Sequence, residues 1–88
     1  KFEIYSDVSY KLDIRGERAI EIENKVERFI DDAYIASLNR VEIIHGKGTG
    51  ALKKVVRELL TKHPKVKNFY FAPVDAGGEG VTIIEFLE

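Results

Sequence analysis

The chain has 88 residues, of which 44% are hydrophobic and 33% are charged. This length allows one hydrophobic core, because small domains bury a smaller share of their surface than large ones do. The absence of cysteine excludes disulfides, thiolate metal sites and thiol nucleophiles. No apolar run approaches the ~20 residues of a membrane helix, so we expect no membrane partner.

The N-terminus lacks the basic and apolar segments of a secretory signal, which favours a cytoplasmic protein. The chain starts at Lys1 and holds no methionine, which is typical of a segment excised from a longer protein. We therefore expect residues 1–88 to form a single domain of a larger parent protein.

The net charge of −1 conceals a strong segregation of charge along the chain. Residues 1–39 hold six Lys/Arg and nine Asp/Glu (−3), residues 40–68 hold eight and two (+6), and residues 69–88 hold none and four (−4). This pattern argues against a uniformly basic nucleic-acid binder, but the basic middle third creates a strong local field.

The first half of the chain predicts a strand, a helix and a strand. Apolar residues alternate over residues 8–14, which indicates a half-buried strand. Residues 17–38 carry apolar side chains three and four apart, which indicates an amphipathic helix. Residues 40–44 are short and rich in Val and Ile, which indicates a buried strand.

The second half predicts a helix followed by a hairpin. A second apolar stripe begins at Ala51, and Pro64 ends this helix because the residue before proline disfavours the helical region. Residues 66–74 and 81–87 are dense in β-branched and aromatic residues, and the glycine-rich residues 75–80 between them predict a turn. The expected element order is βαβαββ.

Right-handed crossovers make the first three strands of such a chain point the same way, so their carboxyl ends share one edge of the sheet. Three glycine-bearing loops follow these strands, at residues 12–16, 45–50 and 75–80. Open α/β sheets bind ligands beyond the carboxyl ends of their strands. We therefore expect the functional site at this edge.

Residues 45–50 read His-Gly-Lys-Gly-Thr-Gly and precede the second helix. Glycines let a ligand approach the backbone, and a helix start offers unpaired N–H groups to an anion. The candidates for phosphate contact in this loop are Gly46, Lys47, Gly48, Thr49 and Gly50. The alternative is a tight turn without a ligand. The loop is not a Walker A motif, because glycine follows the lysine where Ser or Thr is needed.

Lys53, Lys54 and Arg57 extend the basic surface along the outer face of the second helix. A row of cations in this place is suited to a phosphodiester backbone. The alternative is an ordinary solvated helix exterior.

Asp13 and Arg15 lie two apart on an extended segment and therefore point to the same side, opposite to Leu12 and Ile14. They are available for chemistry or for a local ion pair. His45 has an ordinary pKa near ~6.5, which suits either proton transfer or a structural hydrogen bond. A divalent ion among Asp13, His45, Asp75 and Glu79 stays open, because their spacing matches no metal motif.

Three segments together resemble the signature motifs of the Smr (small MutS-related) domain, in the order that the family has them. They are residues 12–16, 44–52 and 77–82. The resemblance covers residues 12–87 and leaves residues 1–11 as an N-terminal extension. It implies a two-layer α/β fold with two helices and a four-stranded mixed sheet of order 1-2-4-3, similar to the C-terminal domain of initiation factor three.

The resemblance also implies a function. Family members nick DNA or cleave messenger RNA on collided ribosomes, and the long glycine motif looks most like that of a bacterial MutS paralogue, an oligomeric ATPase linked to recombination suppression and ribosome rescue. The positions that match the three motifs are Asp13 and Arg15, then His45, Gly46 and Gly48, then Gly78 and Gly80. Many relatives have histidine in place of Arg15, so a two-histidine mechanism does not carry over.

We hypothesise phosphodiester cleavage, in which the basic loop and helix hold the backbone, Arg15 stabilises the developing charge, and Asp13 or His45 moves the proton. RNA supplies its own 2′-hydroxyl nucleophile, whereas DNA needs water, helped by a divalent ion such as Mg²⁺ or Mn²⁺. The alternative is a non-catalytic module that binds nucleic acid or ribosomes.

Overall fold

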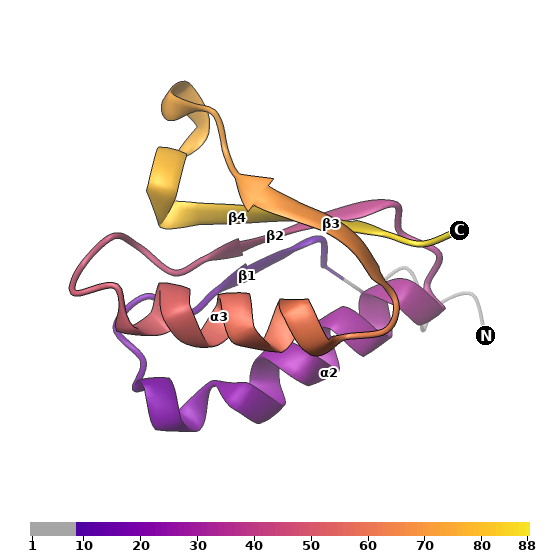
Figure 1. The fold of residues 1–88 in the computed structure, drawn as a ribbon, viewed down its shortest axis with the longest axis horizontal. Coiled ribbons are helices and arrows are strands. Elements are labelled where there is room, and N and C mark those ends of the chain that lie inside the picture. The colour runs from indigo at the N-terminus through magenta and orange to yellow at the C-terminus, as the bar shows by residue number, and fades with distance from the viewer. Residues whose placement is uncertain (1–8) are drawn as a thin grey trace.

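The computed structural model describes residues 9–88, which form a four-stranded sheet covered on one face by two helices (Figure 1). The strands are β1 (Lys11–Asp13), β2 (Arg40–Ile44), β3 (Val66–Phe71) and β4 (Val81–Phe86), and the helices are α2 (Glu23–Ile35) and α3 (Ala51–Lys62). The sheet order is β1-β2-β4-β3, with β1 parallel to β2 and β4 antiparallel to both of its neighbours. The predicted two-layer α/β fold with sheet order 1-2-4-3 is confirmed.

The first predicted helix is divided in two. A short 3₁₀ helix over Ala19–Glu21 precedes α2, so the regular helix is shorter than the predicted residues 17–38. The first strand is also shorter than predicted and pairs with β2 over Lys11–Asp13 only, while Val8 lies outside the described residues. Within residues 9–88, no helix is long and apolar enough to cross a membrane.

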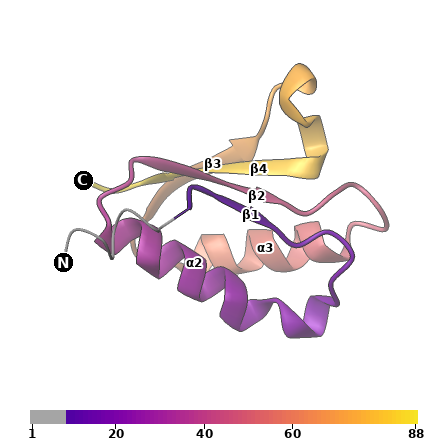
Figure 2. The same cartoon turned by 180° about the vertical axis from the view of Figure 1, so that it is seen from behind.

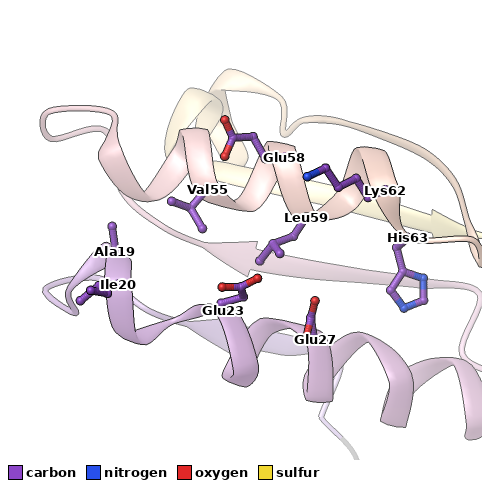
Figure 3. Close-up of a pocket in the computed structure, with 9 residues that line it drawn as sticks. All are labelled: Ala19, Ile20, Glu23, Glu27, Val55, Glu58, Leu59, Lys62 and His63. Atoms are coloured by element: carbon purple, nitrogen blue, oxygen red, sulfur yellow. The ribbon is translucent and has the colours of Figure 1, made fainter.

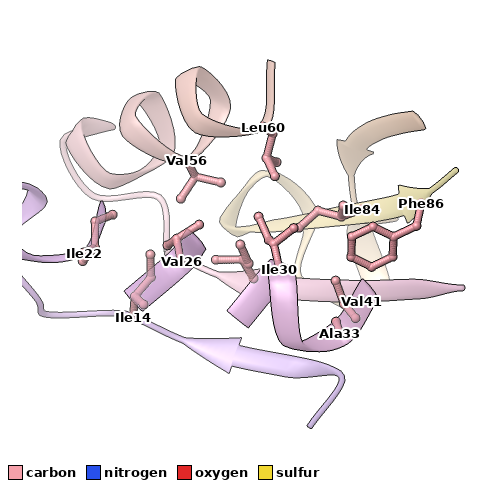
Figure 4. Close-up of a cluster of buried hydrophobic side chains, with 11 residues drawn as sticks. Ile14, Ile22, Val26, Ile30, Ala33, Val41, Val56, Leu60, Ile84 and Phe86 are labelled. Carbon is pink, nitrogen blue, oxygen red and sulfur yellow. The ribbon is translucent and has the colours of Figure 1, made fainter. Parts of the chain in front are cut away.

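The core lies between the sheet and the two helices (Figure 4). The N-cap residue Ile22 and the α2 residues Val26, Ile30 and Ala33 are all fully buried, which confirms the apolar stripe predicted for this helix. The members from the sheet and from α3 are Ile14, Val41, Ile43, Ile84, Phe86, Val56 and Leu60. Burial of these aliphatic side chains fixes the helices on the sheet, because each stabilises the fold by about 1.5–3 kcal/mol.

The predicted hairpin of β3 and β4 is present, and β3 ends at Phe71 rather than Val74. Two 3₁₀ turns, Val74–Ala76 and Gly78–Gly80, fill the connection, which projects from the side of the sheet opposite to the helices (Figure 2). The pairing of β3 with β4 shifts register between Val66 and Asn68, which is the mark of a β-bulge at this end of the outer strand.

The carboxyl ends of β1, β2 and β3 meet at one edge, as the crossover argument predicts. Beyond the end of β1, the Ile14 amide donates to the Ile44 carbonyl oxygen at 2.9 Å. The amides of His45 and Gly46 both donate to the Gly80 carbonyl oxygen, at 3.0 and 2.9 Å. Hydrogen bonds thus join the first glycine-bearing loop to the end of β2, and the second loop directly to the third.

Candidate functional site

The glycine loop, defined as residues 45–50, connects β2 to α3 and contains a row of backbone amides that have no backbone acceptor among the described residues. Gly46 and Gly50 have φ of +76° and +87°, a left-handed conformation that side chains disfavour, and Gly50 is the N-cap of α3. Within residues 9–88, the amides of Lys47, Gly48, Thr49 and Gly50 have no backbone acceptor. Such donors beside the positive end of a helix dipole favour an anion.

A cavity of about 240 Å³ lies against this loop, bordered by residues 45–53 on one side and by Gly16, Glu17 and Ala19 on the other. A second groove, of about 340 Å³, runs between α2 and α3 (Figure 3). Three carboxylates border that groove, from Glu23, Glu27 and Glu58, and they outnumber its one lysine, Lys62, so the groove is unfavourable for a phosphate. Of the two, the cavity at the glycine loop is the one suited to a nucleic-acid backbone.

Asp13 and Arg15 form an exposed ion pair beside the glycine loop. The Arg15 guanidinium donates from Nη2 to Asp13 Oδ2 at 2.6 Å and from Nε to Oδ1 at 3.0 Å. These hydrogen bonds lower the pKa of Asp13 to about 2 and raise that of Arg15, so both are charged at neutral pH. A Cβ placed on Gly46 would stand 3.4 Å from Arg15 Cγ, so the arginine stem packs against the loop.

His45 is only 4% exposed, and both of its ring nitrogens are engaged within the protein. Nδ1 lies 2.9 Å from the Gly46 carbonyl oxygen and Nε2 lies 2.7 Å from Thr82 Oγ1. Because a carbonyl oxygen only accepts, Nδ1 carries the hydrogen and Nε2 accepts from the Thr82 hydroxyl. Burial lowers the pKa of His45, against the raising effect of its bond to the Gly46 carbonyl. The ring is therefore neutral at pH 7 and holds the loop to β4.

The lowered pKa of His45 predicts a loss of stability in mild acid. Below pH 6.5 the histidine binds a proton in the unfolded chain more readily than in the folded chain. The contribution of His45 to the stability of the fold is therefore complete above pH 6.5 and is lost as the pH drops through the folded pKa. We expect the urea midpoint at pH 5 to lie below that at pH 7.5. The contribution of Asp13 to stability is lost at lower pH, between 3.8 and about 2.

His45→Gln is the matched control for this measurement, because its amide keeps a donor and an acceptor but does not titrate between pH 5 and 7.5. We expect its urea midpoint to change less over this interval than that of the unchanged chain. An equal change in the two proteins would show that another group is responsible.

Gly78 and Gly80 were predicted to contact phosphate, and their amides are already engaged. The Gly78 amide donates to the Pro73 carbonyl oxygen at 2.9 Å, and the Gly80 amide donates to that of Gly77 at 3.0 Å. Gly80 is buried, and a Cβ on it would stand 3.4 Å from the Gly46 Cα. Gly80 therefore serves to let two loops approach each other.

The three predicted cations of α3 differ in their surroundings. Lys54 and Arg57 are exposed and Lys53 is half-buried, and both Lys53 and Arg57 lie over aromatic rings of β3. Lys53 Nζ also lies 3.5 Å from Glu79 Oε1 in the hairpin connection. Contact of these three cations with a phosphodiester backbone stays a prediction.

Thr82, Phe69 and Phe71 were missed by the sequence reasoning. A signal for each was present, because Thr82 is a hydroxyl inside an apolar strand and the two phenylalanines alternate with Tyr70 along β3. Alternate residues of a strand share a face, so the two rings belong together. Burial of Thr82, which is 5% exposed, and its bond to His45 emerge only from the fold.

The four candidate metal ligands do not come together. Within residues 9–88, no group of three or more His, Cys, Asp or Glu side chains is placed to hold a metal ion. Asp13 is paired with Arg15, His45 with Thr82, and Glu79 with Lys53. The protein side chains thus do not form a cage, and a Mg²⁺ ion would depend on oxygens of a substrate for most of its ligands.

Comparison with known proteins identifies the family. The model of the Smr domain family matches residues 12–87. The chain belongs to this family. Among solved structures, this Smr domain superposes on the Smr domain of Thermus thermophilus MutS2 with a TM-score of 0.85 and 35% identity, over 89% of this chain and 98% of the other. It superposes on YdaL, a stand-alone small MutS-related protein from Escherichia coli, with a TM-score of 0.84 and 26% identity, over 90% and 65%.

Curated relatives of this Smr domain are much longer proteins. It is 55% identical over 78 residues to a protein named Endonuclease MutS2 from Geobacillus sp. (strain WCH70). It is 51% identical over 78 residues to one named Putative endonuclease MutS2 from Bacillus subtilis (strain 168). The match covers 89% of this chain and 10% of each relative, so the chain spans about a tenth of the length of these proteins.

Proposed function

We propose that this Smr domain is an endonuclease module that cleaves phosphodiester bonds in DNA or RNA. The observation that carries the proposal is the row of unpaired amides at the glycine loop, which faces a cavity and lies beside the Asp13–Arg15 pair. This arrangement puts an anion site next to an exposed cation and an exposed carboxylate. The names of the relatives, Endonuclease MutS2, support the same reaction.

In the proposed reaction, the amides of residues 47–50 and the start of α3 hold the phosphate, and Lys47, Lys54 and Thr49 contact the neighbouring backbone. Arg15 leaves Asp13 to donate two hydrogen bonds to the phosphate oxygens as charge develops on them. The loss of Arg15 raises the pKa of Asp13 from about 2 towards its ordinary 3.8, which makes the carboxylate a better base.

On RNA, the 2′-oxygen bonds to phosphorus as its proton passes to Asp13, and the bond from phosphorus to the 5′-oxygen breaks. Water protonates the departing 5′-oxygen, and the product is a 2′,3′-cyclic phosphate. On DNA, a water oxygen bonds to phosphorus as its proton passes to Asp13, and one ester bond of the phosphate breaks. Solvent protonates the departing oxygen, which leaves a phosphate monoester and a free hydroxyl. We assign the proton transfer to Asp13 because it is exposed, whereas both nitrogens of His45 are engaged. His45 acts as a positioning residue for the loop.

The parent context is part of the proposal. Because the relatives are about ten times longer, we propose that the domain acts at the end of a MutS-related, oligomeric ATPase. The parent would bring it to recombining DNA or to messenger RNA on collided ribosomes, so that recombination suppression or ribosome rescue depends on local cleavage.

The direct test incubates the 88-residue chain with supercoiled DNA and with single-stranded RNA, each with and without EDTA, beside Asp13→Ala. We expect at least one substrate to be cut and Asp13→Ala to cut it much more slowly. Cleavage of RNA should survive EDTA, whereas nicking of DNA should be lost with the divalent ion. Intact substrates in every lane would contradict the nuclease proposal.

A non-catalytic binding module is the second candidate, and a specific observation favours it. Efficient general bases have a pKa near the working pH, whereas Asp13 is held at about 2 by its closed ion pair. If the domain only binds, nucleic acid should shift in a gel without being cut, and Asp13→Ala should bind as well as the unchanged chain.

A further inference from the structure

A third cavity, of about 220 Å³, lies between α3 and the outer strand β3. Its lining residues are Lys53, Arg57, Phe69, Tyr70, Phe71 and Thr82. Phe69 and Phe71 are two apart on β3 and therefore face the same side, towards α3. Both rings are half-buried and line the cavity, and Phe69 also packs against the core.

Two cations lie over these rings. Lys53 Nζ is 5.2 Å from the centre of the Phe71 ring, and the Arg57 guanidinium is 5.7 Å from that of Phe69 and 5.9 Å from that of Phe71. The surface thus combines flat aromatic rings, a flat guanidinium and an ammonium group.

The aromatic cavity adjoins the glycine loop. Lys53 lines both cavities, and Thr82, which also lines the aromatic one, donates its hydroxyl hydrogen bond to the loop residue His45. A strand whose phosphate sits at the glycine loop would therefore bring a neighbouring nucleotide to Lys53. From there its base reaches Phe71 and Arg57.

We propose that the cavity of Phe69, Phe71, Arg57 and Lys53 is a stacking site for one unpaired nucleobase next to the bound phosphate. Aromatic side chains and arginine planes stack bases in proteins that hold single strands, and cations follow the phosphates beside them. A base within a duplex is stacked on its neighbours and is not free to enter. This inference rests on the proposed function and assigns it a substrate class, nucleic acid with at least one unpaired base.

The test compares Phe71→Leu with the unchanged 88-residue chain for binding of fluorescent oligonucleotides. Leucine keeps an apolar side chain at this position but removes the flat ring. We expect Phe71→Leu to weaken binding of single-stranded RNA or DNA by about tenfold, because the base loses the ring on which it stacks. Binding of a fully paired duplex of the same sequence should change less than twofold. The RNA and DNA arms show which sugar the site accepts.

An oligonucleotide with abasic sugars throughout provides a second measurement. It should bind the unchanged chain and Phe71→Leu equally, because it has no base to stack. Phe29→Leu makes the same change at a half-buried ring of α2 and should leave binding unchanged. A loss with Phe71→Leu that is equal for intact strands, abasic strands and duplex would overturn the stacking site, and so would no loss at all.

These outcomes separate the stacking site from the proposed function. If the unchanged chain cuts nucleic acid but Phe71→Leu binds single strands equally well, only the stacking site is wrong. If the unchanged chain binds neither single strands nor duplex, both proposals are wrong.

Discussion

Arg15→Ala should lower the rate of phosphodiester cleavage by about 10²–10³-fold, the usual loss when one donor to a developing charge is removed. Arg15 is the guanidinium that lies against the glycine loop, where its stem packs on Gly46. Without it, the loop amides remain to hold the phosphate, but no side-chain cation meets the charge that forms during the reaction. Single-turnover cleavage of the substrate that the domain cuts is the measurement.

Two comparisons make this test specific to Arg15. Arg15→Lys keeps the charge but loses the two-point contact, so we expect a rate between those of Arg15→Ala and the unchanged chain. In Arg15→Ala the pKa of Asp13 should rise from about 2 towards 3.8, which an NMR titration measures. Cleavage at the unchanged rate by Arg15→Ala would remove the arginine from the mechanism.

Gly80→Val should destabilise the domain by about 1–3 kcal/mol, the usual cost of overpacking a closed site. Gly80 is buried, and its carbonyl oxygen accepts from the amides of His45 and Gly46. A valine would push its branches against the backbone of Gly46. The glycine loop would then shift relative to Arg15, so cleavage should also fall, by up to about 100-fold for a displacement near 1 Å.

Gly80→Ala is the matched control, because its single Cβ would stand 3.4 Å from the Gly46 Cα and 3.5 Å from the Gly46 carbonyl carbon, an ordinary contact. We expect it to unfold within about 1 kcal/mol of the unchanged chain, since small volume changes are tolerated far better than large ones. Urea unfolding and cleavage assays measure both variants. If valine is tolerated as well as alanine, the close approach of the two loops is not what this glycine provides.

The fold could be predicted from the sequence because its signals are local. The apolar stripe of residues 22–33 and the alternation in the strands each follow from which side chains must be buried. Their boundaries were less accurate, since a 3₁₀ turn replaced the start of the first helix and β3 ended at Phe71. Such ends depend on packing against other elements, which periodicity does not contain.

The candidate site could be located but not fully assembled from the sequence. Topology correctly brought Asp13, Arg15 and the glycine loop to one edge. The hydrogen-bond and ion-pair partners of each side chain could not be predicted, because these partners are distant in the chain. The ring of His45 is engaged by Thr82, 37 residues away, and Lys53 meets both Glu79 and Phe71.

The register shift at the start of β3 also bears on self-association. An outer strand offers unpaired backbone groups to any second chain, and a bulge with a charged residue blocks such pairing. Here the shift falls around Lys67, which is exposed. Within residues 9–88, β1 at the opposite edge pairs over three residues. The bulged end of β3 is a poor template for adding a strand from another molecule, so we expect little β-sheet aggregation of this domain through the β3 edge.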